Sequence, residues 1–170
     1  DEYFQYPNPP QVPSTVEITY PVYSVDLQTG VKRELFRVNK EFSAASRGGV
    51  IAWFDRSHYR AVYSNSTGGS FAVGNEEGPR TLYVYDAASG SVREVPTPSG
   101  LPSSLPAVSD SFVAFIDGTG FDVRAYDLAS GSLKAIDISG RQHMNADAEG
   151  DYIACEEGFG AAALAVVFTE

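Results

Sequence analysis

Three segments of the sequence share one form: Tyr23-Ser-Val-Asp26-Leu-Gln-Thr-Gly30, Tyr83-Val-Tyr-Asp86-Ala-Ala-Ser-Gly90 and Arg124-Ala-Tyr-Asp127-Leu-Ala-Ser-Gly131. Each is an alternating strand that ends in Asp-x-x-[Ser/Thr]-Gly. The carboxylate can accept backbone N–H groups of the turn, and the glycine supplies the positive φ that a hairpin bulge needs. The pattern therefore predicts three β-hairpins, with second strands at residues 31–38, 91–95 and 132–138. The residues expected to shape their turns are Asp26, Gly30, Asp86, Gly90, Asp127 and Gly131.

A second set of similar segments lies at residues 46–55, 109–117 and 148–157. In each, a short turn opens a strand with an alanine at its centre and an acid at its end. Ala114 and Ala154 are 40 residues apart, and Asp86 and Asp127 are 41 apart. A period near 40 with four short strands is typical of a β-propeller blade. We therefore predict an all-β protein, a propeller-like array of four-stranded antiparallel blades with almost no helix.

The strand count gives about three blades, which makes the array incomplete as a single chain. With the strands of a blade called a, b, c and d in chain order, the chain opens with a c–d hairpin over Val16–Val38. Two complete blades follow at Phe42–Val95 and Leu105–Ile138, and the chain finishes with a, b and a c-like strand. Closed propellers typically have four to eight blades.

Two segments stand apart from the repeats. Residues 1–15 form a segment rich in proline and aromatic residues, which precedes the repeat domain of residues 16–170. Residues 56–80 are inserted between the b and c strands of the first complete blade. Because this insertion is longer than most connections, we expect either an extra hairpin or a binding loop.

The repeats resemble TolB-type (WD40-like) β-propeller repeats. The resemblance rests on [Ser/Ala]-x-[Asp/Gly]-x-[aromatic/aliphatic]-[Val/Ile]-Ala-x-x-[Asp/Glu], followed by Tyr-x-Tyr-Asp-Leu-x-[Ser/Thr]-Gly, and covers roughly residues 16–168. It is most similar to the form found in archaeal and bacterial cell-surface proteins. The resemblance implies a propeller-type fold and a cell-surface setting, but the family mixes scaffold, binding and enzyme-associated proteins, so it does not assign chemistry.

An incomplete array leaves three arrangements open. The chain is a piece of a longer propeller, or two copies close a six-bladed ring, or copies join head to tail as a filament by strand complementation. A fourth alternative is that both ends cap one compact sheet. We expect a non-enzymatic structural or interaction protein whose partner is a homo-oligomer or polymer of itself. The apolar residues expected at its assembly contacts are Tyr3, Phe4, Val16, Ile18, Leu164 and Val166.

Charge and composition exclude several partners. The chain has 22 Asp and Glu against 12 Lys and Arg, a net charge of −10, which argues against nucleic acid and anionic membranes. No apolar run of 18 residues occurs, so we expect no membrane span. The start at Asp1 favours maturation by proteolysis, and Asn65-Ser66-Thr67 makes Asn65 a candidate glycosylation site. Together these features predict an extracellular or cell-surface glycoprotein.

The sequence predicts no catalytic residue, no metal ligand and no cofactor. Asp55, Ser57 and His58 include the residue types of a nucleophilic triad, but they crowd four consecutive positions, and no Gly-x-Ser-x-Gly occurs. An ordinary strand end is the better interpretation. The alternative function is a ligand-binding or enzymatic propeller, with a pocket at one mouth of the ring lined by the insertion at 56–80.

A calcium site is also a weaker interpretation than a turn. Asp147, Glu149 and Asp151 alternate like the opening of a calcium loop, but Gly150 falls at the fourth position instead of the sixth. The same positions are turns in the other copies. We therefore expect a surface turn here.

Overall fold

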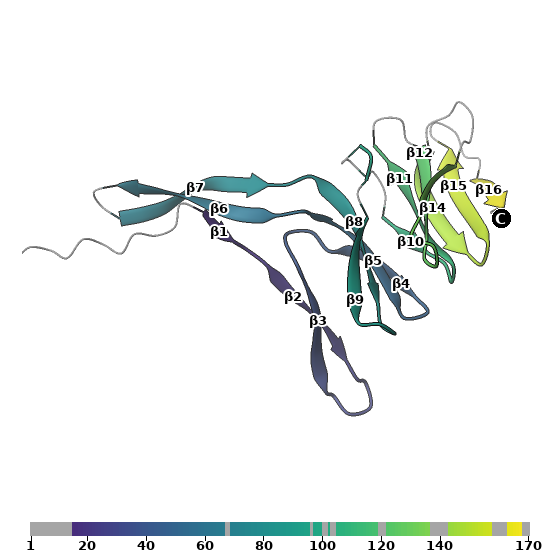
Figure 1. The fold of residues 1–170 in the computed structure, drawn as a ribbon, viewed down its shortest axis with the longest axis horizontal. Coiled ribbons are helices and arrows are strands. Elements are labelled where there is room, and N and C mark those ends of the chain that lie inside the picture. The colour runs from purple at the N-terminus through teal and green to yellow at the C-terminus, as the bar shows by residue number, and fades with distance from the viewer. Residues whose placement is uncertain are drawn as a thin grey trace, which may run out of the picture.

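The computed structural model describes residues 15–66, 69–95, 97–99, 102, 105–118, 122–136, 143–157 and 163–167. These residues form strands β1 to β16 and no helix. The strands make several small antiparallel sheets, none of which is closed (Figure 1). The all-β class predicted from the repeats is therefore confirmed.

Four of the sheets follow one another along the chain. The first sheet pairs β2 (Tyr20–Val25) with β3 (Lys32–Val38). The second has the order β4 (Ser43–Arg47), β5 (Val50–Arg56), β8 (Arg80–Asp86), β9 (Ser91–Val95). The third has the order β10 (Ala107–Val108), β11 (Phe112–Asp117), β12 (Asp122–Asp127), β13 (Leu133–Ile136). The fourth has the order β14 (His143–Glu149), β15 (Tyr152–Glu157), β16 (Ala163–Val167). The second and third sheets thus have the a-b-c-d strand order of the repeats.

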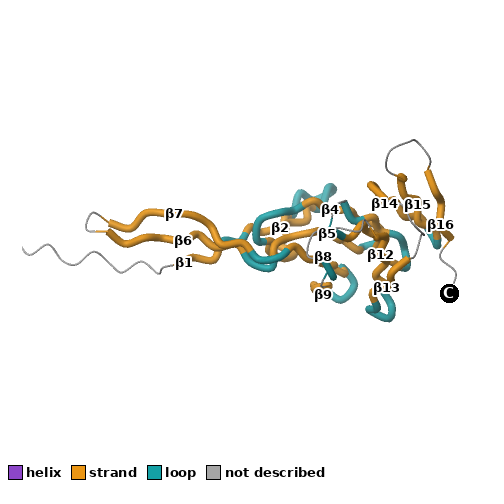
Figure 2. The backbone as a smooth tube through the Cα atoms, turned by 90° about the horizontal axis from the view of Figure 1, so that it is seen from above, coloured by secondary structure: helices purple, strands orange, loops and turns teal. Residues whose placement is uncertain are grey.

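The insertion is an antiparallel hairpin that leaves the body of the molecule. It consists of β6 (Tyr59–Ser66) and β7 (Gly69–Glu77), and β1 (Thr15–Glu17) adds a third strand to it. We call these three strands the ribbon; it projects away from the four sheets (Figure 2). A hairpin beginning at Val16 was predicted, and this is wrong: Val16 pairs with Ala61 of the ribbon, and the first hairpin begins at Tyr20. The sequence of β1 carries no sign that its partner is the insertion.

Ion pairs hold the base of the ribbon to the second sheet. Arg56, which ends β5, lies 3.5 Å from Glu77 of β7 and 3.6 Å from Glu41. Glu41 also pairs with Arg80 at 2.7 Å, and Lys40 pairs with Glu77. Because these side chains are only partly exposed, the charges are screened less than on an open surface. They fix where the ribbon leaves the body.

The four sheets stack in chain order, with an apolar cluster between each neighbouring pair. The alternation of side chains along a strand explains this, because odd and even positions face opposite neighbours. On β5, Trp53 faces the first sheet, whereas Ala52 and Phe54 face the third. The rings of Phe54 and Phe115 meet edge to face, with centroids 5.5 Å apart. Inner sheets are therefore buried on both faces.

The three predicted turns share one geometry. Gly30, Gly90 and Gly131 have φ of 71°, 67° and 70°, the left-handed region expected from the sequence. In each turn, the glycine N–H donates to the backbone carbonyl of the aspartate four residues earlier. A repeated local sequence therefore gives a repeated local structure.

Candidate functional site

The outer face of the first sheet carries large apolar residues and charges of both signs. Two basic groups, Lys32 and Arg37, stand against Glu34, which pairs with Tyr23 across the sheet and lies 3.1 Å from Arg37. Tyr23 and Val25 of β2 are 42% and 53% exposed, although both are large apolar residues. Lys32 pairs with Val25 across the sheet, and its Nζ lies 3.6 Å from the centroid of the Tyr23 ring. The opposite face of the same sheet buries Phe36 and Val38 against the second sheet. The outer face therefore lacks the cover that the inner face has, as far as the described residues show.

The outer face of the fourth sheet carries carboxylates around an aromatic residue. Ile153 of β15 is fully buried toward the third sheet, so its neighbours Tyr152 and Ala154 point outward and are exposed. Glu149 pairs with Tyr152 and Asp147 with Ala154, which puts both acids on this face. The two ends of the row of sheets thus present opposite net charges.

Both end sheets also have a free strand edge among the described strands. β2 pairs only with β3, and β16 pairs only with β15, whereas the corresponding strands β8 and β12 are paired on both edges. An unpaired edge is a template for pairing with another chain. The second and third sheets also end in strands with a single partner, so what sets the end sheets apart is that the strand before or at the turn position, β2 or β16, lies at an edge instead of inside the sheet.

The predicted assembly residues fall in different places. Val16 and the backbone N–H of Ile18 are both engaged with β6 of the same chain. Leu164 and Val166 lie in β16, opposite Cys155 and Ile153. Tyr3 and Phe4 lie outside the described residues. Asn65, the candidate glycosylation site, lies in β6 of the ribbon.

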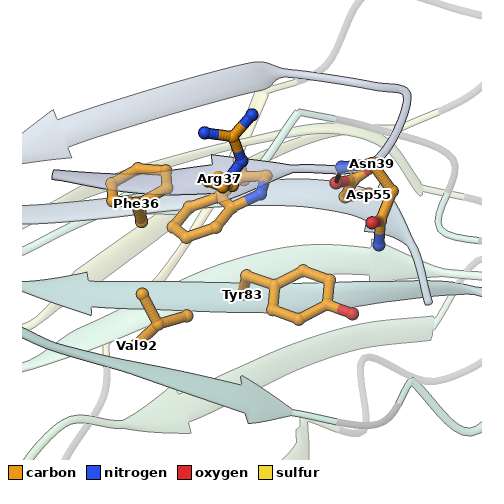
Figure 3. A pocket seen from close by; sticks show the side chains of 7 residues that line it. Phe36, Arg37, Asn39, Asp55, Tyr83 and Val92 are labelled. Carbon is orange, nitrogen blue, oxygen red and sulfur yellow. Dashed lines mark hydrogen bonds between the residues drawn. The ribbon is translucent and has the colours of Figure 1, made fainter. Parts of the chain in front are cut away.

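A cavity of about 230 Å³ lies between the first and second sheets. Phe36 stacks on Trp53 with ring centroids 4.3 Å apart, and Trp53 stacks on Tyr83 at 5.5 Å. Figure 3 shows Phe36 and Arg37 on one side, across from Tyr83 and Val92. The lining residues are Phe36, Arg37, Asn39, Trp53, Asp55, Tyr83 and Val92. No sequence pattern predicts this cavity, because its walls come from four strands.

Two buried carboxylates hold the connections between sheets. Asp55 ends β5 and is 1% exposed; its carboxylate accepts hydrogen bonds from the backbone N–H groups of Asn39, Lys40, Glu41 and Arg56. Asp117 ends β11 and is 4% exposed; its carboxylate accepts the hydroxyl of Ser99. Each acid fixes the chain that leads into its own sheet from the sheet before. The signal was the acid at the end of every repeat, to which the sequence alone assigned no role.

The arrangement of Asp55 does not suit a catalytic triad. All the hydrogen bonds of its carboxylate to described residues come from backbone N–H groups, and none comes from His58. His58 instead faces Glu76, with Nε2 3.6 Å from a carboxylate oxygen. Nor does the described part of the chain contain three or more His, Cys, Asp or Glu side chains grouped to hold a metal ion.

The turn aspartates use their carboxylates locally. Asp26 accepts the N–H groups of Gln28 and Thr29, and Asp127 accepts the N–H and hydroxyl of Ser130. These hydrogen bonds, first those from the Thr29 and Ser130 backbones, lower the pKa of both carboxyls. Asp86 behaves in the same way, with the Ser89 hydroxyl as the main cause of its lowered pKa. These side chains shape turns and face no common site.

Comparison with known proteins finds no matching family model and no significant similarity to a curated protein. No helix that could cross a membrane is present in the described part of the chain. The features that remain for a functional argument are the two outer faces, the free edges and the aromatic cavity.

Proposed function

We propose that this chain is a non-enzymatic structural protein of the cell surface that assembles with copies of itself, the first sheet of one copy meeting the fourth sheet of the next. The observation that carries the proposal is the pair of uncovered outer faces, one with more basic than acidic groups and one acidic. We also propose that the sheets are blades of a TolB-type propeller array, so that assembly continues the row of blades from copy to copy.

The inner sheets supply the precedent for such a contact. The second sheet packs on the third through Phe54 and Phe115, and the third packs on the fourth through Ile116 and Ile153. A further junction of the same kind would cover Tyr23 and Val25 with Tyr152 and Ala154. Burying such side chains contributes on the order of 1.5–3 kcal/mol each before the entropy of association is subtracted.

Charge gives this junction a direction. The chain has a net charge of −10, so copies repel one another in most orientations. Lys32 on the first sheet opposite Asp147 and Glu149 on the fourth would make a head-to-tail orientation the favourable one. A head-to-head contact would instead bring like faces together. The contact is therefore heterologous, which produces a closed ring or a filament.

The curvature of the row favours the propeller interpretation. The first strands of the second, third and fourth sheets, β4, β10 and β14, lie next to one another in that order. Arg47, the last residue of β4, lies 3.0 Å from Asp110, in the turn between β10 and β11, and 3.7 Å from Glu149, the last residue of β14. One side chain reaches both because the first strands converge. Convergence of inner strands is how blades surround an axis.

The test is sedimentation velocity of the intact chain over a range of concentrations. We expect wild type to form species larger than one chain, and Tyr23→Ser/Val25→Ser to sediment as a single chain. Val73→Ser is the matched control, because Val73 is 55% exposed but lies on the ribbon. Identical mass distributions for wild type and the double variant, or a wild type that stays a single chain, would overturn the proposal.

A charge exchange tests the direction of the contact. Lys32→Glu should weaken association about fivefold, the size of a partly exposed ion pair. Adding Asp147→Lys to the same chain should restore it, because the pair is then reversed. Asp147 is chosen over Glu149 because Glu149 already pairs with Arg47. Equal association of all three proteins would show that these faces do not meet.

A further inference from the structure

The aromatic cavity has the dimensions of a site for one ring. Its volume of about 230 Å³ is below the roughly 300–1,000 Å³ of ordinary small-molecule pockets. Its walls are aromatic rings and the side chain of Val92, with Arg37 at the rim (Figure 3). A flat or compact apolar ring therefore fits it better than a whole metabolite.

Two hydrogen-bond donors border the cavity with no partner among the described residues. Trp53 is 1% exposed, and its indole Nε1 has no hydrogen-bond partner. A buried donor without an acceptor is costly, but Nε1 itself has almost no accessible surface, so the donor that a ligand can reach is the hydroxyl of the partly buried Tyr83. The Tyr83 hydroxyl makes no hydrogen bond that the described residues provide. Burial, with the nearby Glu94 and Asp55 carboxylates, raises the pKa of Tyr83 to about 12, so the phenol keeps its proton at neutral pH.

The remaining polar groups of the cavity are already engaged. Asp55 accepts four backbone N–H groups, and the Asn39 side-chain amide donates to the carbonyl of Arg56. The site therefore offers aromatic faces and a hydroxyl donor, and few acceptors. This is the chemistry that recognises polyproline-type segments, in which proline rings pack on aromatic side chains and backbone carbonyls accept hydrogen bonds.

We propose that the cavity binds a proline ring of an extended segment, and that this segment is residues 1–14 of a second copy of the chain. Those residues contain four prolines, Pro7, Pro9, Pro10 and Pro13, and begin with two acids, Asp1 and Glu2. This inference rests on the proposed self-assembly and adds a second contact between copies.

The direction of β1 is the reason for assigning the segment to another copy. Thr15 pairs with Val62 and Glu17 with Arg60, so the chain enters β1 from the tip side of the ribbon and runs toward the body. The cavity lies in the body, between β3 and β5. Because β1 begins on the tip side of the ribbon and the cavity lies in the body, we assign the cavity's occupant to a second copy.

The experiment uses Trp53, the only tryptophan of the chain, as the reporter. A synthetic peptide of residues 1–14 is titrated into the Tyr23→Ser/Val25→Ser chain, held at low concentration so that copies are dispersed, and the tryptophan emission is recorded. We expect a saturable change in emission. A peptide with Pro9 and Pro10 replaced by alanine should bind at least about tenfold more weakly, since it loses the rings and the extended preference.

A pair of tyrosine variants locates the site. Tyr83→Phe should weaken peptide binding about three- to tenfold through the loss of one hydrogen bond. Tyr85→Phe is the control, because Tyr85 lies two positions along β8 and packs against the same cluster without lining the cavity. Absence of a saturable change, or equal binding of both peptides, would overturn the inference. Because sedimentation tests self-assembly separately, assembly without peptide binding would remove this inference alone, and peptide binding without assembly would remove the proposed function and the assignment of the segment to a second copy, but not the ligand class of the cavity.

Discussion

The third sheet and the first sheet are built from the same turn and the same alternating strands, but they differ in how many faces are covered. On β11 every residue from Phe112 to Asp117 is buried, because the second and fourth sheets lie on either side. On β2 Tyr23 and Val25 are exposed, whereas Tyr126 of β12, which occupies the position of Val25 before the same turn in the third sheet, is buried. Burial is thus decided by the neighbouring sheet and not by the local sequence. This difference is what makes the first sheet a candidate for contact with another molecule.

The largest expected effect is a truncation in the doubly covered region. Phe115→Ala should lower the free energy of unfolding by about 3–5 kcal/mol, since Phe115 is fully buried and packs against Phe54. Tyr23→Ala should change it by about 1 kcal/mol or less, through loss of the contact with Lys32. Urea unfolding of the dispersed chain, followed by circular dichroism, measures both. Similar losses would mean that the first sheet is covered in solution.

The second effect concerns the carboxylates that join sheets. Asp55→Ala should cost about 3 kcal/mol, because a hydrogen bond to a charged group contributes about 1.5–3 kcal/mol and several backbone donors lose their acceptor together. The matched control is Asp26→Ala, which removes an aspartate that also accepts backbone N–H groups but is exposed. We expect a clearly smaller loss there, in the same urea assay. Equal losses would contradict the anchoring role of Asp55.

The third effect tests the turns that the sheets share. Gly90→Val should destabilise the chain by about 1–3 kcal/mol, because φ is 67° and a β-branched residue is strained there. A Cβ at Gly90 would meet no atom within 4 Å, so the cost is conformational. Gly74→Val is the control: its Cβ is equally free, but it lies in β7 without a positive φ, and thermal melting should not fall.

Local sequence was sufficient to predict the elements of the fold. The Asp-x-x-[Ser/Thr]-Gly turns and the strands with a central alanine predicted the four-stranded order of the second and third sheets, since these features depend on residues close in sequence. The pairing of β1 with β6 could not be predicted, because Val16 suits pairing with β6 as well as it suits a place in the first hairpin. Long-range pairing of short strands depends on tertiary contacts that the pattern does not encode.

The candidate sites were less predictable than the fold. Lys32 and Asp147 are ordinary surface residues in the sequence, and only the stacking order shows that they lie on opposite outer faces. The cavity depends on Phe36 meeting Trp53 across two sheets. The sequence shows Asp55 as an acid at a strand end, but its role depends on the position of the loop at residues 39–41. Each of these depends on residues far apart in the chain.

The smallest expected effect is a loss of stability at acid pH, to which the turn aspartates of the first three sheets contribute together. The pKa values of Asp26, Asp86 and Asp127 are lowered from 3.8, mainly by hydrogen bonds from Thr29, Ser89 and Ser130. A carboxyl whose folded pKa lies below its unfolded pKa stabilises the fold fully above the unfolded value, and the contribution is lost as the pH falls through the folded one. The melting temperature should therefore begin to fall near pH 4 and continue to fall below it. A chain with all three aspartates changed to asparagine should melt lower at pH 7 and lose less between pH 5 and pH 2, because asparagine does not titrate. If the two chains lose the same amount over that range, the three turns contribute nothing to the acid sensitivity and the prediction is wrong.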